Sequence, residues 1–465
     1  MGVCGLKLDD SSSNLLDALG NDLIDWRLWL SRAVVIGFAT LAGLTVVVFT
    51  WMTEHAFSLF ERLNGAAAWA PLLWTPLCAA GIVWVMRRYA VGAAGSGIPQ
   101  VMAAMEGAAA GQRHLFVSLR LTAAKMLLTA AGMLGGLSLG REGPSVQIAA
   151  GVMHHARHYL PDKTQVSDHG LLMAGGAAGI AAAFNTPLGG IMFAIEELSR
   201  RPEQRSNGLL LAAIVLSGLM AVSIYGNATY FGVIKVGELS LALFWPALLV
   251  ALACGLTGGL FARLLLLSVS SESADRFSRW RQRSPVAFAA ACGLVLAVIG
   301  LVSHGSTYGT GYSHSRDLLE GDGETTPLYT LLKFVATWIT TWSGVPGGIF
   351  APALSIGGSL GNNIAQLTHY ANAPTLIALG MAGFLAAVTQ APLTAFIIVM
   401  EMVDGHALVL SLMATALVAS GVSRLLCVPL YHAMAQLQLQ RMPAAAPTAA
   451  PTAAPTAAPT AAPTA

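Results

Sequence analysis

The amino-acid sequence predicts an all-α polytopic membrane protein. Charged residues make up 10% of the 465 residues, hydrophobic residues make up 55%, and the mean hydropathy is +0.65. Soluble domains carry roughly 25% charged residues, so a soluble chain of this composition would lack the polar groups to cover its surface. Several apolar stretches also approach or exceed the length of about 20 residues that a helix needs to cross a bilayer: 31–52, 71–86, 208–226, 241–269, 286–303 and 405–422.

Charge and cysteine usage exclude several other classes of protein. A net charge of +2 is too close to neutral for a nucleic-acid-binding protein. The histidines at 154, 155 and 158 fit a polar loop better than a metal site, and G-x-S-x-G at 357–361 lacks the strand–turn–helix context of a hydrolase. We therefore expect no metal, no cofactor and no enzymatic activity. The scattered cysteines form no C-x-x-C pair and predict neither disulfides nor zinc: Cys4, Cys78, Cys254, Cys292 and Cys427.

The two ends of the chain differ from its apolar middle. Residues 1–30 carry five aspartates ahead of the first apolar run, so they do not resemble a signal peptide. Their apolar spacing predicts an amphipathic helix, either on the membrane surface or in solvent. From Pro443 the chain repeats A-A-P-T, and 442–465 is predicted to be a disordered tail. We expect no soluble regulatory domain after the membrane part.

The middle of the chain matches itself. With a shift of 208 residues Lys125 falls on Lys333, and with a shift of 205 residues Glu196 falls on Glu401. The lysine match is informative because the whole chain has only five lysines. Recurrence in both halves favours a role of these residues in the fold. The matches predict two membrane repeats, 31–236 and 237–441.

Short Gly/Pro-rich segments interrupt the apolar sequence. Glycine permits unusual backbone angles, and proline suits the first turn of a helix. Each segment should therefore open a helix whose first N–H groups lack intrahelical acceptors. Several such N-termini meeting at one point would form an anion site, since each carries a partial charge of about +0.5. Repeats with broken helices are typical of transporters. The segments are 92–100, 140–144, 184–190, 343–352 and 390–393.

Clusters of arginine predict the orientation in the membrane. Basic connections favour the cytoplasmic side, so the end of the segment carrying Glu196 and Glu197 is expected there too. These arginines are Arg87, Arg88, Arg200, Arg201, Arg205, Arg276, Arg279, Arg281 and Arg283.

Four short motifs occur in the order found in the CLC chloride channel and transporter family, which the chain resembles from about residue 30 to 440. The resemblance implies an inverted-repeat CLC-type fold with many tilted and broken helices. It also implies a homodimer in the lipid bilayer, a separate chloride pathway in each subunit, and cytoplasmic termini. The missing regulatory domain is typical of bacterial members, which suggests a bacterial inner membrane. The motifs are G-S-G-I-P (95–99), G-R-E-G-P (140–144), G-G-I-F-A-P (347–352) and P-L-Y (429–431).

The resemblance also implies an anion site. Chloride would be bound by the hydroxyls of Ser96 and Tyr431 and by the backbone N–H groups of Ile349 and Phe350. The structural alternatives are that the Ser96 hydroxyl bonds to a backbone carbonyl and that Tyr431 is a tyrosine at the membrane surface.

Two glutamates match the family's proton-handling positions. Glu142 would be the external gating glutamate, and a carboxylate in an apolar segment is by default a functional group. Its alternative is a structural cap paired with the preceding arginine. Glu197 would be the internal proton glutamate, and Met402 at the matching position of the second half makes it particular to the first. The chain departs from many relatives at Gln100, where an acid is common, and the next acid is Glu106.

We therefore expect a chloride/proton antiporter. The alternative is a passive voltage- or pH-gated chloride channel, which needs the same anion site but no proton path. Glu197 favours exchange. An intramembrane hydrolase using Ser96 or Ser359 is disfavoured because no His/Asp partner set accompanies either serine.

Overall fold

The structure is a computed structural model. It describes residues 26–106, 110–161, 166–199, 208–226, 229–232, 241–270, 275–321 and 326–441. Residues 1–25 of the predicted N-terminal helix and the tail 442–465 lie outside the described residues. Across the described part the regular structure is helical, apart from a single β-bridge. The predicted fold class is therefore confirmed.

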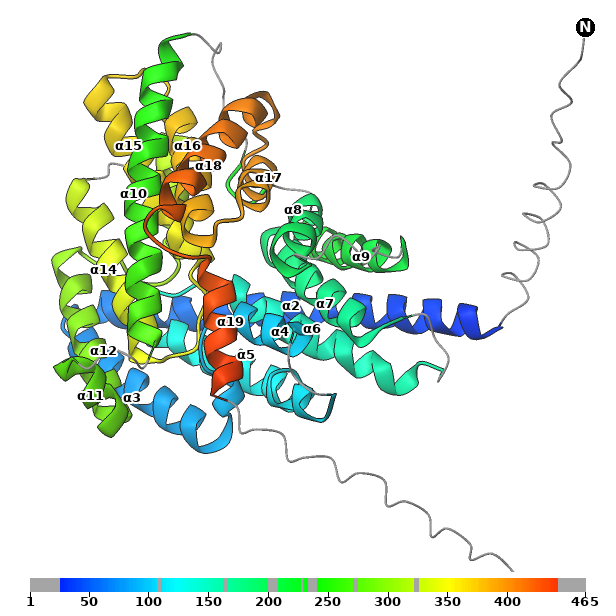
Figure 1. Cartoon of the computed structure of the whole chain (residues 1–465). Helices are drawn as coiled ribbons and strands as arrows, with labels where there is room; N and C mark the ends of the chain where they lie inside the picture. The colour runs from blue at the N-terminus through cyan, green and yellow to red at the C-terminus, as the bar shows by residue number, and fades with distance from the viewer. Residues whose placement is uncertain are drawn as a thin grey trace, which may run out of the picture.

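Of the eighteen α-helices among the described residues, ten belong to the second half of the chain (Figure 1). The first half forms α2 (Trp26–Ala66), α3 (Pro71–Tyr89), α4 (Ile98–Glu106), α5 (Leu119–Leu134), α6 (Glu142–His155), α7 (Asp168–Phe184), α8 (Pro187–Phe193) and α9 (Gly208–Tyr225). The second half forms α10 (Phe244–Val269), α11 (Arg276–Arg283), α12 (Pro285–Val302), α13 (Tyr312–Glu320), α14 (Pro327–Ser343), α15 (Phe350–Thr368), α16 (Ala373–Thr389), α17 (Pro392–Met402), α18 (Val409–Arg424) and α19 (Leu430–Gln440).

Five helical segments among the described residues are long and apolar enough to cross a membrane. Four of them overlap an apolar stretch predicted from the sequence, and Gln112–Leu134 does not. Together with the composition, they identify a membrane protein. The segments are Trp26–Ala66, Gln112–Leu134, Phe244–Val269, Pro285–Val302 and His406–Arg424.

The long helices surround shorter, fully buried ones. In α10, exposed Leu249, Leu252, Leu256 and Leu260 recur at helical spacing, as expected of a lipid-facing stripe. Nearly every residue of α6, α7 and α16 is instead buried. The short helices therefore lie where other protein segments, rather than lipid, surround their irregular ends.

Small residues let these inner helices approach closely. A Cβ atom added to Gly357 of α15 would lie 2.3 Å from the carbonyl oxygen of Gly380 in α16. A Cβ added to Gly380 would lie 2.2 Å from the carbonyl oxygen of Gly357. The two helices thus pack backbone to backbone, as is common inside membranes.

Candidate ion-binding site

Three helices begin beside one another: α4, α6 and α15. The loops before α6 and α15 form an antiparallel bridge, in which Gly140 N–H donates to Gly348 O (2.7 Å) and Gly348 N–H donates to Gly140 O (2.8 Å). Gly347 N–H donates to Gly95 O (3.4 Å), which attaches the loop before α4. Backbone hydrogen bonds therefore hold three of the predicted Gly/Pro segments together.

Glycines make this close approach possible. Gly95 and Gly97 have φ angles of +79° and +113°, which side chains with a Cβ rarely adopt. A Cβ on Gly97 would lie 2.4 Å from Gly143 O, and a Cβ on Gly143 would lie 2.4 Å from the Ser96 Oγ. The Ser96 hydroxyl is therefore packed against the first turn of α6.

Lys125 is fully buried and supports the loop that carries Ser96. Its Nζ donates to the carbonyl oxygens of Ala93 (2.9 Å) and Gly95 (2.6 Å). Lys333 makes the corresponding pair of bonds to two carbonyls of the loop 307–309, at 2.9 and 2.8 Å. The equivalence favours the predicted role of both lysines in the fold over direct chloride binding.

Gln100 also braces this loop. Its Oε1 accepts a hydrogen bond from Gly97 N–H (2.9 Å), and its Nε2 donates to Ala94 O. The neutral amide can both donate and accept, whereas an ionised carboxylate can only accept. Glu106, the next acid along the chain, lies 3.5 Å from the imidazole of His432 in α19. The departure from the family pattern thus has a local structural role.

Glu142 is the first residue of α6, and its side chain is buried. Its Oε2 accepts a hydrogen bond from the backbone N–H of Ala351 (3.4 Å), at the start of α15. Its Oε1 has no hydrogen-bond partner among the described residues. The carboxylate therefore lies where two helix N-termini offer positive partial charge.

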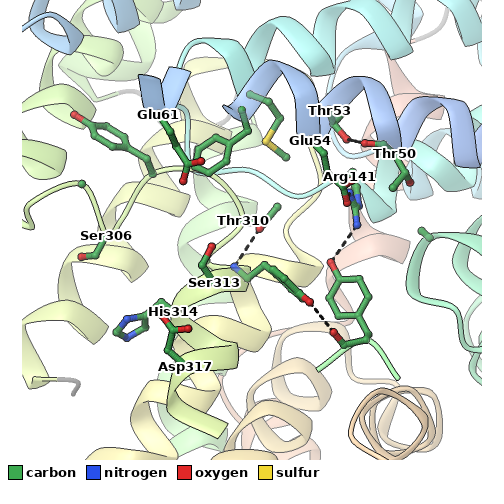
Figure 2. Close-up of a pocket in the computed structure, with 18 of the residues that line it drawn as sticks. Thr50, Thr53, Glu54, Glu61, Arg141, Ser306, Thr310, Ser313, His314 and Asp317 are labelled. Carbon is green, nitrogen blue, oxygen red and sulfur yellow. Dashed lines mark hydrogen bonds and ion pairs between the residues drawn. The ribbon is translucent and has the colours of Figure 1, made fainter. Parts of the chain in front are cut away.

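Arg141 forms its ion pair elsewhere. Its guanidinium donates to Glu54 of α2 (2.6 Å) and to the Tyr230 hydroxyl (3.3 Å) (Figure 2). The sequence reasoning missed Glu54 and Tyr230. The sequence did contain an indication of Glu54, because an acid inside an apolar helix is by default a functional residue.

The two predicted hydroxyl ligands lie inside the protein. Ser96 Oγ and Tyr431 Oη are buried and have no hydrogen-bond partner among the described residues. The Tyr431 ring stacks on that of Phe350, with centroids 6.0 Å apart. Its hydroxyl lies near Ser96 and within electrostatic range of Glu142 and Glu197. Phe350, Ser96 and the two predicted proton glutamates therefore all lie in the neighbourhood of Tyr431.

Ile349 completes the predicted anion set. It is the N-cap residue of α15, directly before Phe350, and is 4% exposed. It lines a cavity of about 400 Å³ together with Ser96 and Tyr431. The same cavity is lined by Arg87, Arg281 and Arg441, and we name it the arginine vestibule.

Glu197 lies on a single π-helical turn, Ala194–Leu198, that continues from α8. Its side chain is 1% exposed. π-Helical turns are rare and frequently mark functional sites. Here the turn places Glu197 inside the protein within electrostatic range of Tyr431.

Its neighbour Glu196 has a different task. The Glu196 carboxylate accepts from the N–H groups of Leu393 (3.1 Å) and Thr394 (2.7 Å), at the start of α17. Glu401, at the end of α17, accepts in turn from two N–H groups at 188–189, at the start of α8 (3.2 and 2.7 Å). The two helices thus cap each other, which supports the structural interpretation of Glu196.

A second cavity, of about 530 Å³, reaches Arg141, the neighbour of Glu142. Figure 2 shows the side chains that line it, and we name it the acidic vestibule after its carboxylates Glu54, Glu61 and Asp317. His314 lies on the same wall as Asp317. The two vestibules approach the Glu142 region through different residues and carry opposite charge.

Comparisons with known proteins agree with this geometry. Residues 78–424 match the family model described as voltage gated chloride channel. A crystal structure of a slow cyanobacterial Cl⁻/H⁺ antiporter is 25% identical, with a TM-score of 0.74 over 89% of this chain and 98% of that one.

Two further structures share the fold. A CLC-type fluoride/proton antiporter is 21% identical, with a TM-score of 0.71 over 86% of this chain and 96% of that one. A eukaryotic CLC transporter is 19% identical, with a TM-score of 0.69 over 88% and 74%. The chain therefore belongs to the CLC family of chloride channels and transporters.

Proposed function

We propose that the protein is a chloride/proton antiporter, with chloride bound by Ser96, Tyr431 and the N–H groups of Ile349 and Phe350. One observation carries this proposal: the buried hydroxyls of Ser96 and Tyr431 lie near each other, have no hydrogen bond of normal geometry among the described residues, and lie beside a buried carboxylate at meeting helix N-termini. Buried polar groups are normally hydrogen-bonded, so these hydroxyls call for a ligand. A chloride ion can accept both hydrogen bonds.

Glu142 couples the two ions in this proposal. Its ionised carboxylate occupies a position that an anion could take, where helix N-termini stabilise negative charge. When protonated it loses that attraction and leaves the path, which admits chloride. Each opening or closing of the gate therefore binds or releases a proton, so Glu142 belongs to both the chloride path and the proton path.

Glu197 supplies the second proton station. It is buried and is close enough to Tyr431 for its charge to act there. A buried ionisable group inside a membrane protein is costly unless it has a function. The likeness to a cyanobacterial Cl⁻/H⁺ antiporter supports the same interpretation.

A passive voltage- or pH-gated chloride channel is the second candidate. The same anion site would serve it, and the family model is named after channels. It would have no use for the buried Glu197. In an antiporter the movement of chloride drives protons against their gradient, whereas in a passive channel it does not.

We further propose a homodimer of duplicated subunits in the bilayer. The reciprocal capping by Glu196 and Glu401 and the matching bonds of Lys125 and Lys333 support the repeats 31–236 and 237–441. The capping brings the starts of α8 and α17 to one surface, where Leu188 is 51% exposed, and this surface is the proposed dimer contact.

Arginine placement supports the orientation. Arg87, Arg281 and Arg441 gather at one vestibule, which the positive-inside rule assigns to the cytoplasm. Both termini are then cytoplasmic, in a bacterial inner membrane.

A reconstituted flux assay tests the proposal. Purified protein in vesicles receives an outward chloride gradient with no proton gradient. Proton movement inward, against the gradient that develops, is expected of an antiporter. Chloride flux with no proton movement would instead identify the channel.

A further inference from the structure

Arg141 and Glu142 are neighbours in the chain, but among the described side chains they form no ion pair with each other. Arg141 is the N-cap residue of α6, and Glu142 is its first residue. The Arg141 guanidinium donates instead to Glu54 Oε1 of α2 (2.6 Å) and to the Tyr230 hydroxyl (3.3 Å). One cation therefore has two carboxylates within electrostatic range, Glu54 and Glu142, and its side chain bonds to the first.

Both neighbours keep a buried atom that could form the missing pair. Arg141 Nε and Glu142 Oε1 are buried, and neither has a hydrogen-bond partner among the described residues. Buried polar atoms are normally hydrogen-bonded, and a guanidinium can donate to a carboxylate from Nε as well as from its two Nη atoms. A direct bond between Arg141 and Glu142 is therefore chemically available, and the bond to Glu54 competes with it.

Glu54 connects this buried pair to water. Its side chain is 56% exposed, whereas that of Arg141 is 9% exposed. Both line the acidic vestibule, where Figure 2 shows Glu54 beside Arg141. An exposed carboxylate thus holds a buried arginine that directly precedes the proposed gate.

The other titratable groups near this pair come from several elements. Tyr230 acts on Arg141, Tyr312 donates to Tyr230 O (2.8 Å), and Tyr431 of α19 lies within electrostatic range of Glu142. Tyrosine hydroxyls are neutral near pH 7, so Glu54 is the ionised acid that acts on Arg141 together with Glu142. The other helices packed against α6 include α15, which has no charged residue, and three whose charged groups bond elsewhere: Lys125 of α5 to Ala93 and Gly95, Glu106 of α4 to His432, and Asp168 of α7 to Arg113.

We propose that Glu54 is a positioning residue, which holds Arg141 away from Glu142 and thereby sets the pH at which the gate opens. The inference rests on the gating role proposed above for Glu142. Glu54 offsets part of the Arg141 charge, and its bond keeps the guanidinium turned toward the vestibule. Without Glu54, the Arg141 charge acts in full on Glu142 and stabilises the ionised carboxylate that blocks the path. Protonation of the gate then needs a lower pH.

Chloride flux against pH tests this inference on the full-length protein in vesicles, with equal pH on both sides. Glu54→Ala removes the carboxylate and its hydrogen bond. Glu61→Ala is the matched control, because Glu61 is also exposed, lines the same cavity and lies about two turns further along α2. We expect the midpoint pH of the flux to fall by about one unit in Glu54→Ala, at the lower end of the effect of an arginine on a neighbouring carboxylate. In Glu61→Ala it should change by less than about 0.3 unit, a twofold change in proton affinity.

Glu54→Gln provides a second variant that removes the charge but leaves an acceptor for the buried guanidinium. It should shift the midpoint in the same direction by a smaller amount, and it decides the question against Glu61→Gln if Glu54→Ala does not fold. A midpoint that is unchanged in the folded Glu54 variants would overturn the proposal.

Ionic strength separates the bond from the general field of the vestibule. An impermeant salt screens exposed charges, but it acts much less on the buried Arg141 and Glu142. The shift in Glu54→Ala should therefore persist at high ionic strength. Equal shifts in the Glu54 and Glu61 variants, or a shift that vanishes at high ionic strength, would overturn the proposal, because the net charge of the vestibule would then explain the result.

A double variant shows whether Glu54 acts through the gate. Glu142→Gln cannot titrate, so adding Glu54→Ala to it should leave the flux independent of pH. A midpoint that still depends on Glu54 in the Glu142→Gln background would overturn the proposal. The measurement does not require proton coupling. The expected shift in a protein whose chloride flux moves no protons would contradict the proposed antiport and leave the role of Glu54 standing.

Discussion

The Glu142 carboxylate accepts a hydrogen bond from the backbone N–H of Ala351, although the two residues are 209 positions apart. Glu142 starts α6, and Ala351 belongs to the first turn of α15. One carboxylate therefore satisfies a donor of the helix that also carries the Phe350 N–H. In the proposed mechanism, this carboxylate and a transported anion compete for the same helix N-terminus.

The variant Glu142→Gln removes the titratable charge and keeps the size of the side chain. We expect chloride flux that no longer responds to pH and is not coupled to protons, because the gate is always neutral. Chloride and proton fluxes measured together in vesicles check this. Strict coupling in the variant would refute the assignment of Glu142 as the gate.

The variant Glu197→Gln should affect protons and chloride differently. Proton transport should be lost while chloride binding stays within about twofold, because Glu197 is not among the proposed chloride ligands. Calorimetric titration with chloride and proton flux give the two readouts. The matched control is Glu196→Gln, which removes a neighbouring charge but leaves Glu197 in place. Loss of chloride binding in Glu197→Gln would show instead that Glu197 has a structural role.

Lys125→Met and Lys333→Met test the two buried lysines as a pair. Each variant leaves two backbone carbonyls without a donor, at a cost of about 1–3 kcal/mol per unsatisfied group. Thermal unfolding in detergent should therefore show lower stability for both. Only Lys125→Met should also weaken chloride binding, because its loop carries Ser96. Equal chloride affinity in the two variants would show that the loop supported by Lys125 does not contribute to chloride binding.

Ser96→Pro tests selectivity. The serine hydroxyl donates a directed hydrogen bond, which helps to replace water around a strongly hydrated chloride ion. Nitrate is more weakly hydrated and depends less on that donor. We expect the variant to shift coupled exchange from chloride toward nitrate, measured by side-by-side fluxes. An unchanged preference in a folded variant would place selectivity at the N–H groups of Ile349 and Phe350.

Local sequence predicted much of this architecture. Apolar length predicted four of the five spanning segments among the described residues, and Gly/Pro clusters predicted the helix starts that converge near Glu142. Both signals arise from short-range chemistry, since lipid forces backbone groups to bond internally and glycine permits close contacts. The structural role of Glu196 also followed from its match with Glu401 in the second half of the chain.

Partners from distant segments could not be predicted in the same way. The pairing of Arg141 with Glu54 joins residues 87 positions apart. The mutual capping of α8 and α17 depends on packing between the two halves, although the match of Glu196 with Glu401 hinted at it. The hydrogen bonds of Gln100 to its own loop are contacts over three to six positions, so this role depends on local sequence alone.

Proton movement driven by chloride tests the central claim most directly. Vesicles containing the unaltered protein are loaded with chloride, diluted into low chloride at equal pH on both sides, and followed with a pH electrode. The proposal predicts that chloride efflux drives protons into the vesicles and makes the outside more alkaline, and that Glu142→Gln abolishes this signal. Chloride efflux from the unaltered protein with no change in external pH would contradict it and identify a passive channel.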